Sequence, residues 1–292
     1  MEGRLLELTK SELLSDFITA CLQDYESTKT KATYVSMRYS LTAFFDFNGD
    51  KELSKLNKRD LSEFVNYRIK AGYAKTSVNI DIRNLKAALS KALEWELIHN
   101  NPFYGFKQLK TDRQAPKFLS LEDIHKVSTA IDDPIIKRAF FFYILTGCRR
   151  EEILSLTWQD LDIERRVIHI KKSKTHLDRW IPINDSLMEI IDTIPHKIGF
   201  LFQGKKKGTH LHKDTMTHKI KQYLKKAGFA EMRLHDLRHT FASQLALSGE
   251  SLQTIRDLLG HTDIRTTEIY AHLTNDHLKA AVNKLKIDIG KE

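Results

Sequence analysis

The first part of the chain, residues 1–112, repeats apolar positions with the period of an α-helix. The stretch KSELLSDFITACLQD (10–24) spaces them at i, i+3, i+4 and i+7, which gathers five side chains on one face: Leu13, Leu14, Phe17, Ile18 and Cys21. The same style continues over 31–47, 57–72 and 74–98. Four helices joined by short polar loops predict a small helical bundle.

The pattern changes in the second part. Helical stretches at 120–131, 133–147 and 149–161 are followed by two β-type runs, RRVIHI (165–170) and RWIPI (179–183). These runs flank KKSKTHLD (171–178), so they predict a hairpin with a lysine-rich tip. Helices return from 217–228 to the C-terminus. The expected fold is therefore mainly α, with a small antiparallel β-sheet in the second part.

A domain boundary is expected near residue 112. The sequence HNNPFYGF (99–106) ends a helix with Asn-Asn-Pro and a later glycine. The following KQLKTDRQAPKFLS (107–120) indicates an extended basic connector. A chain of 292 residues is long enough for two domains, which we place at 1–112, with a basic linker to about 117, and at 118–292.

Charge is unevenly distributed. The net charge is +9 and the pI about 9.3. Residues 1–112 hold 17 Lys and Arg against 15 Asp and Glu, whereas residues 113–292 hold 30 against 23. The excess favours a polyanionic partner. In the first part, four cations expected to be exposed either follow a phosphate backbone or form a solvated face: Lys75, Arg83, Lys86 and Lys91.

Membrane and secretory classes are not indicated. The longest apolar run, AFFFYIL (139–145), is far too short to span a bilayer. The start, MEGRLLELTK, lacks the basic and apolar regions of a signal peptide. Cys21 and Cys148 form no disulfide or metal pattern, which favours a reducing compartment, so we expect a cytoplasmic protein.

Three short stretches carry candidate chemistry. In TGCRREE (146–152), Arg149 opens a helix, where a guanidinium and free backbone N–H groups together suit an anion. In LHDLRHTFAS (234–243), His235 and Arg238 are three residues apart and share a helix face. In LGHTDIRTTEIYAH (259–272), His261 precedes Tyr270 by nine residues.

Together these side chains suit a phosphodiester. The two arginines would neutralise the non-bridging oxygens, and Tyr270 would attack the phosphorus. A lysine, Lys174 on the hairpin tip, would protonate the leaving oxygen. Taken alone, Tyr270 is more simply explained as a core aromatic, and Arg149 as a cap or a partner of Glu152. Their joint occurrence in one order favours the phosphodiester site.

These stretches resemble the tyrosine recombinase (phage integrase) family. TGCRREEILSLTWQD resembles the first arginine box and KSKTHLDRWIPI the lysine hairpin. LHDLRHTFASQLALSG resembles the His-x-x-Arg box, and LLGHTDIRTTEIYAHL the His/Trp-then-Tyr box. The helical first part is similar to the family's core-binding (SAM-like) domain. The resemblance implies strand exchange on double-stranded DNA through a 3′-phosphotyrosyl intermediate, without metal or other cofactor.

The resemblance also implies a role for each matching residue. Tyr270 is the expected nucleophile, and Arg149 and Arg238 bind the phosphate. Lys174 and His235 form the general acid and base pair, with Lys172 as the second choice for the lysine. His261 takes the catalytic position that holds His or Trp in the family, and Glu152 supports Arg149. His239 and His272, which flank the key positions, are expected to have structural roles.

The resemblance implies a C-shaped clamp on DNA and a tetrameric synapse, with a C-terminal helix at 276–289 docking on a neighbouring protomer. A paralogous recombinase is a possible alternative partner. The chain starts directly with the core-binding domain, so it is most similar to the short Xer-type recombinases without an arm-binding domain. Dimer resolution and the integration or excision of DNA both remain open.

Two other interpretations remain. His235 and His239 have the i, i+4 spacing of two zinc ligands, with His210 or His212 as a third, which would suit a metallohydrolase. Arg238 would then place a positive charge beside the metal, and no His-Glu-x-x-His is present. The other interpretation is a DNA-binding protein of the same fold that no longer cuts.

Overall fold

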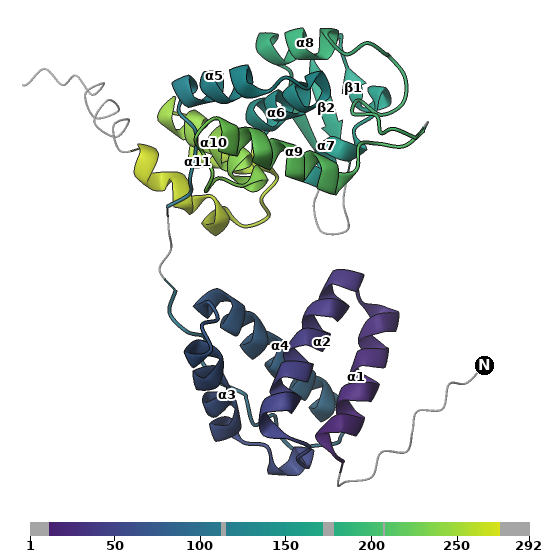
Figure 1. The fold of residues 1–292 in the computed structure, drawn as a ribbon, viewed down its shortest axis with the longest axis vertical. Helices are drawn as coiled ribbons and strands as arrows, with labels where there is room; N and C mark the ends of the chain where they lie inside the picture. The colour runs from purple at the N-terminus through teal and green to yellow at the C-terminus, as the bar shows by residue number, and fades with distance from the viewer. Residues whose placement is uncertain (1–11, 112–114, 172–177, 207, 275–292) are drawn as a thin grey trace, which may run out of the picture. The chain divides into compact units, whose positions relative to one another are not determined.

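The structure is a computed structural model that describes residues 12–111, 115–171, 178–206 and 208–274 (Figure 1). The chain divides into two compact units, Met1–Arg113 and Gln114–Glu292. Each has its own apolar core. Over the described residues the fold is mainly helical, with one small antiparallel sheet, as the sequence predicts.

The described part of the first unit is the predicted bundle of four α-helices. They are α1 (Leu14–Thr28), α2 (Lys31–Asn48), α3 (Lys58–Lys70) and α4 (Lys75–Glu94), with a 3₁₀ turn η1 at Leu53–Lys55. Phe44 lies at the centre, edge-on to Phe64 at 5.3 Å and to Phe103 at 5.6 Å between ring centroids. Leu13 was predicted to share the buried face of α1, but it precedes the helix and is exposed.

Local signals set the helix ends. The Asn57 side chain accepts from the N–H of Arg59 and completes a capping box with Asp60, which starts α3 as predicted. The helix expected over 74–98 ends earlier, at Glu94. Glu96 has a φ of 60°, a left-handed conformation that a helix cannot contain, so the chain turns there.

A buried ion pair joins α3 to α4. Arg68 Nε donates to Asp81 Oδ2 at 3.1 Å, and the Ser40 hydroxyl donates to Asp81 Oδ1 at 2.8 Å. The Arg68 guanidinium lies 3.5 Å from the ring centroid of Tyr73. Charge, hydrogen bonds and an aromatic face therefore all compensate the buried cation.

The predicted row of exposed cations on the first unit is only partly correct. Lys75 and Arg83 are exposed. Lys86 and Lys91 are half-buried instead. Lys86 donates to the carbonyl of Phe106 at 3.2 Å, and Lys91 pairs with Asp24 at 2.6 Å.

The second unit surrounds the buried helix α6 (Pro134–Thr146). The other helices are α5 (Leu121–Ala130), α7 (Arg150–Ser155), α8 (Asp185–Asp192), α9 (Lys213–Lys226), α10 (Leu234–Leu247) and α11 (Leu252–Leu259), with 3₁₀ segments η2 (Trp158–Asp160), η3 (Ile264–Thr266) and η4 (Glu268–Thr274). Helix α6 packs against α8, α9 and α10. The expected cap at Ser120 is present and forms a capping box with Asp123.

The sheet has the order β1-β2-β3, with all neighbours antiparallel. The predicted hairpin is confirmed as β2 (Val167–Ile170) and β3 (Arg179–Pro182), with Ile168 opposite Ile181. A third strand, β1 (Leu161–Asp162), pairs with β2 and was not predicted. Helix α8 was not predicted either.

The helix predicted over 149–161 was too long, because α7 ends at Ser155. The backbone of Thr157 forms a bridge with Phe200, and the Leu156 carbonyl accepts from the N–H of Leu201. The N–H and hydroxyl of Thr157 donate to Asp160 at 2.8 and 2.6 Å and start the separate turn η2. These non-helical hydrogen bonds replace those that would continue the helix.

Within the second unit, the start of α7, the helix α10, the end of α11 and the segment η4 converge. Segment η4 packs on α10, and its Tyr270 lies in a small apolar cluster with four buried residues: Ala242, Ala246, Ile255 and Leu259. In the described part of the chain, no helix combines the length and apolar character needed to cross a bilayer.

Candidate active site

Two glycine-terminated helix ends meet at Arg238. Gly147 ends α6 and Gly260 ends α11, both in the left-handed conformation, with φ of 60° and 65°. Arg238 on α10 is 2% exposed; its Nη1 donates to the Gly147 carbonyl at 2.5 Å and its Nη2 to the Leu259 carbonyl at 2.7 Å. The guanidinium therefore ties together the segments that lead into Arg149 and His261.

Arg149 precedes α7 and joins the same group. Its Nη1 donates to Glu152 Oε1 at 3.0 Å and its Nη2 to the Gly260 carbonyl at 3.4 Å. Burial, and then the charge of Arg149, lower the pKa of Arg238 to about 10. Among the described residues, Arg238 forms no ion pair, and three of its five N–H groups are left over after the two carbonyl bonds. A buried, uncompensated cation of this kind favours an anion.

Glu152 holds two arginines rather than one. Besides the bond from Arg149, its two carboxylate oxygens accept hydrogen bonds from Nη1 and Nη2 of Arg179, at 3.1 and 2.7 Å. Arg179 begins β3 and also donates from Nε to the Leu258 carbonyl at 3.0 Å. Burial would raise the pKa of Glu152, but the hydrogen bonds and charge of Arg179 outweigh it and lower that pKa to about 2. Arg179 was not singled out from the sequence.

Tyr270 lies within hydrogen-bonding distance of a histidine. The residue is 1% exposed, and its Oη is 2.6 Å from His239 Nδ1. The ring of His239 is edge-on to that of His235, with centroids 5.0 Å apart. Burial raises the pKa of Tyr270 to about 12, although the Arg238 charge acts in the opposite direction. Burial, followed by the charge of Arg238, lowers the pKa of His235.

His261 follows the end of α11. Its Nδ1 is 3.0 Å from the hydroxyl of Thr267. Burial, and then the charges of Arg238 and Arg149, lower the pKa of His261 to about 4. The imidazole is thus neutral at pH 7, and its one N–H is on either Nδ1 or Nε2, because the Thr267 hydroxyl can donate or accept. In the tautomer with the proton on Nε2, that N–H is available to an anion held by the arginines.

The described part of the chain brings together six of the seven residues selected from the sequence: Arg149, Glu152, His235, Arg238, His261 and Tyr270. Lys174 and its alternative Lys172 lie outside the described residues. Lys171 is described, and it pairs with Asp160 at 2.5 Å. The C-terminal segment 276–289 is also outside the described residues.

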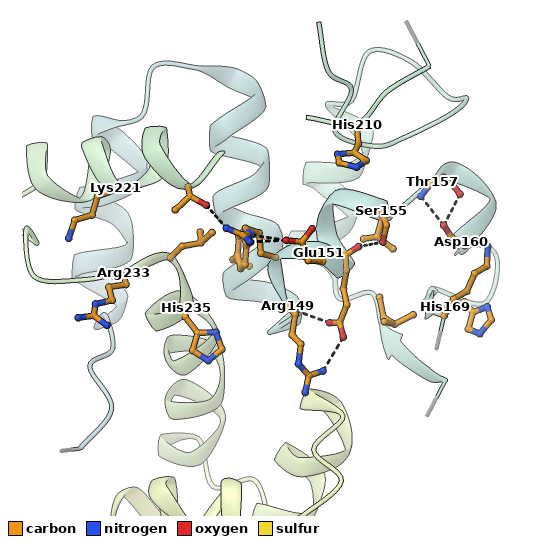
Figure 2. Close-up of a pocket in the computed structure, with 18 residues that line it drawn as sticks. Arg149, Glu151, Ser155, Thr157, Asp160, His169, His210, Lys221, Arg233 and His235 are labelled. Carbon is orange, nitrogen blue, oxygen red and sulfur yellow. Dashed lines mark hydrogen bonds and ion pairs between the residues drawn. The ribbon is translucent and has the colours of Figure 1, made fainter. Parts of the chain in front are cut away.

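A cavity of about 1050 Å³ opens beside Arg149 and His235 (Figure 2). Its walls come from α7, α9, α10 and β2. Further cations line it: Arg150, Lys171, Lys221 and Arg233. Figure 2 shows Lys221 and Arg233 on the same wall as His235, with His169 and Asp160 on another. Three carboxylates line it as well, Glu151, Glu152 and Asp160, against five cations with Arg149 included. The net positive charge around a concave surface of this size suits a polyanion.

The geometry does not assemble the zinc site. His235 and His239 are neighbours, as their spacing predicts, but His239 is bonded to Tyr270. In the described part of the chain, no three His, Cys, Asp or Glu side chains are grouped as metal ligands. His212 instead caps α9, where its ring accepts from the N–H of Asp214.

Comparison with known proteins agrees with this architecture. Residues 117–277 match the phage integrase family and residues 13–110 match the phage integrase SAM-like domain. The first unit thus corresponds to the SAM-like domain and the second unit to the integrase domain. The chain belongs to the phage integrase family.

Individual relatives match along most of the chain. Tyrosine recombinase XerA of Pyrococcus horikoshii is 28% identical over 96% of this chain and 96% of its own. The ICEBs1 integrase of Bacillus subtilis is 27% identical over 94% of this chain and 81% of its own. The fold is also similar to the Tn1549 transposon integrase in complex with circular intermediate DNA, with a TM-score of 0.76 at 23% identity, covering 92% and 99%.

Proposed function

We propose that this protein is a site-specific DNA recombinase that cuts and rejoins strands through a transient 3′-phosphotyrosyl intermediate. Membership of the phage integrase family supports the activity class, and the similar proteins include named recombinases and an integrase bound to DNA. The observation that carries the proposal is the Arg238 guanidinium. Among the described residues it is buried without an ion-pair partner, and it donates to the Gly147 and Leu259 carbonyls, next to the Gly260 carbonyl that Arg149 contacts. It also lies close enough to Tyr270 to affect the pKa of that phenol.

The proposed chemistry follows from these positions. Arg149 and Arg238 would bind the non-bridging oxygens of the scissile phosphate and stabilise the added charge in the transition state. His261 would donate Nε2–H to the same phosphate. Tyr270 would attack the phosphorus, and Lys174 and His235 would serve as the general acid and base pair, in which Lys174 protonates the leaving 5′ oxygen. Glu152 would keep Arg149 in position.

Duplex DNA is the proposed partner. The cationic cavity beside Arg149 is available to the backbone next to the scissile phosphate, and the helical unit would act as the core-binding domain on the same DNA, completing a clamp. We further propose a tetrameric synapse in the cytoplasm, formed through residues 276–289 of neighbouring protomers. Dimer resolution and integration are both compatible with the proposal, since the similar proteins include an integrase and a tyrosine recombinase.

A nicked DNA substrate tests the proposal. A nick just beyond the scissile phosphate lets the short fragment that leaves with a 5′ hydroxyl diffuse away after cleavage. The covalent protein–DNA adduct therefore accumulates. Wild-type protein should give an adduct on a denaturing gel without added metal. Tyr270→Phe removes one buried hydroxyl and little packing, so it should bind DNA and give no adduct. A Phe variant that still forms the adduct would place the nucleophile elsewhere.

A further inference from the structure

His239 occupies the position where a base for Tyr270 is needed. It lies on α10, one residue after Arg238, and its Nδ1 is 2.6 Å from Tyr270 Oη. In the described part of the chain, no other side chain forms a hydrogen bond with that hydroxyl. The sequence comparison with the family predicted only a structural role for this histidine.

Both partners of this hydrogen bond are neutral at pH 7. Burial, and then the nearby His235, lower the pKa of His239 to about 4, so its imidazole is uncharged. Burial keeps the Tyr270 phenol protonated at the same pH. Of the two neutral tautomers, the one with its proton on Nε2 accepts the phenol hydrogen at Nδ1. In that tautomer a lone pair on Nδ1 faces the proton that the nucleophile must lose.

We propose that His239 is the general base that accepts the Tyr270 proton during strand cleavage. The proposal rests on Tyr270 being the nucleophile, as argued above. In cleavage, the bond from Oη to phosphorus forms, the bond from phosphorus to the 5′ oxygen breaks, and the phenol proton moves to His239 Nδ1. The leaving oxygen takes a separate proton from Lys174, so the base for Tyr270 is His239 rather than His235. In rejoining, the steps reverse, and His239 returns its proton to the departing Tyr270.

The surroundings of His239 make its proton transfer readily reversible. The titratable and charged groups that act on His239 or face it come from α10, η4 and the segment after α11: His235, Asp236, Arg238, Tyr270 and His261. Arg238 and burial disfavour a lasting imidazolium, so the proton is held weakly and is available for rejoining. His235, 5.0 Å away between ring centroids, is close enough to respond to the charge that His239 gains.

The pH dependence of adduct formation by His239→Asn tests the proposal. The Asn amide occupies the place of Nδ1 and accepts the hydrogen bond, but it cannot take the proton. Single-turnover adduct formation on the nicked substrate should fall by about 10²–10⁴-fold at pH 7, the usual contribution of a general base. The rate of adduct formation by the wild type should not vary through the titration of His239 between pH 6 and 8. The Asn variant should become faster with rising pH, about tenfold per unit, because the phenol must then lose its proton to hydroxide.

A purely structural role would slow the Asn variant equally at every pH, and that result, or a wild-type rate, would overturn the proposal. His239→Ala should regain adduct formation with added imidazole. If imidazole left the rate of this variant unchanged, that would count against a base at this position. His272→Asn, an exposed histidine two residues after Tyr270, is the matched control and should behave as wild type. A missing adduct in the wild-type protein would instead contradict the proposed function itself.

Discussion

Each unit of the molecule contains a buried arginine, and the two are compensated differently. Arg68 in the helical unit is 4% exposed and pairs with Asp81 at 3.1 Å beneath the ring of Tyr73. Arg238 in the second unit is 2% exposed and contacts backbone carbonyls only, among the described hydrogen bonds. Burial disfavours both charges, but Tyr39 and Asp81 leave the pKa of Arg68 raised, whereas the pKa of Arg238 falls to about 10.

This difference separates a structural cation from a functional one. Arg68 has its counter-ion inside the protein, so the cost of removing its charge from water is offset within the fold. Arg238 and Arg149 lie near one another, and the nearest carboxylate, Glu152, is shared with Arg179. The second unit therefore folds with an excess of positive charge at one place, which an incoming phosphate would neutralise. A fold tolerates such an arrangement where binding or catalysis requires it.

The largest effect on stability is expected at Arg68. Arg68→Met leaves Asp81 buried without a counter-ion, which should lower the free energy of unfolding by about 3–5 kcal/mol. Arg238→Met loses two carbonyl hydrogen bonds but also removes an uncompensated charge, so its loss should stay below about 2 kcal/mol. Urea denaturation of both variants measures the difference. Equal losses at the two sites would contradict the distinction.

Of the two buried arginines, Arg238 is expected to have the larger effect on activity. Arg238→Met should reduce the rate of adduct formation by about 10²–10³-fold, as loss of one transition-state contact usually does. Arg238→Lys should be nearly as slow, because one ammonium cannot hold both carbonyls and the phosphate. DNA affinity should change by less than about tenfold. If Arg238→Met lost DNA affinity as completely as it lost cleavage, Arg238 would contact the phosphate in the ground state only.

Glu152 should give a smaller, pH-dependent effect. Its folded pKa of about 2 is below the ordinary value of 4.5, so the charged form stabilises the folded protein. This stabilisation, of order 2–3 kcal/mol, is fully present above pH 4.5 and is lost as the pH falls towards 2. Glu152→Gln should therefore be less stable than wild type at pH 7, and the gap should close in acid. A gap that is the same at pH 7 and pH 3 would contradict the assignment.

The smallest expected effect is stabilisation by inorganic phosphate. If the arginine pair is an anion site, phosphate at about five times its Kd should stabilise the wild type by about 1 kcal/mol. Thermal unfolding in phosphate against chloride of equal ionic strength measures this shift. Arg238→Met should lose it, and Arg68 should have no part in it. An identical shift in wild type and Arg238→Met would mean that phosphate binds elsewhere.

Sequence patterns predicted the helices of the first unit and the β2–β3 hairpin because periodic burial determines them. They were less successful where tertiary hydrogen bonds decide the structure. Residues 149–161 have an adequate helical pattern, yet α7 stops at Ser155 because Leu156 and Thr157 bond to the 199–201 segment. The two-residue strand β1 is too short to leave a period of its own.

The candidate site was predictable to the extent that motifs placed its residues in order. Arg179 was not recognised, and His239 was assigned only a structural role or a zinc-ligand alternative. Arg179 begins a strand, where an arginine usually faces solvent, and only the fold brings it to Glu152 and the end of α11. The contact of His239 with Tyr270 joins residues 31 positions apart, so no local spacing indicates it.

The central claim is that Tyr270 forms the covalent bond to DNA beside the two arginines. The most direct test is mass spectrometry of the adduct trapped on the nicked substrate. Trypsin should release the peptide of residues 266–279, which contains Tyr270 as its only tyrosine. This peptide should carry a nucleotide linked through its 3′ phosphate to Tyr270. Attachment to any other residue, or a purified adduct with Tyr270 unmodified, would contradict it.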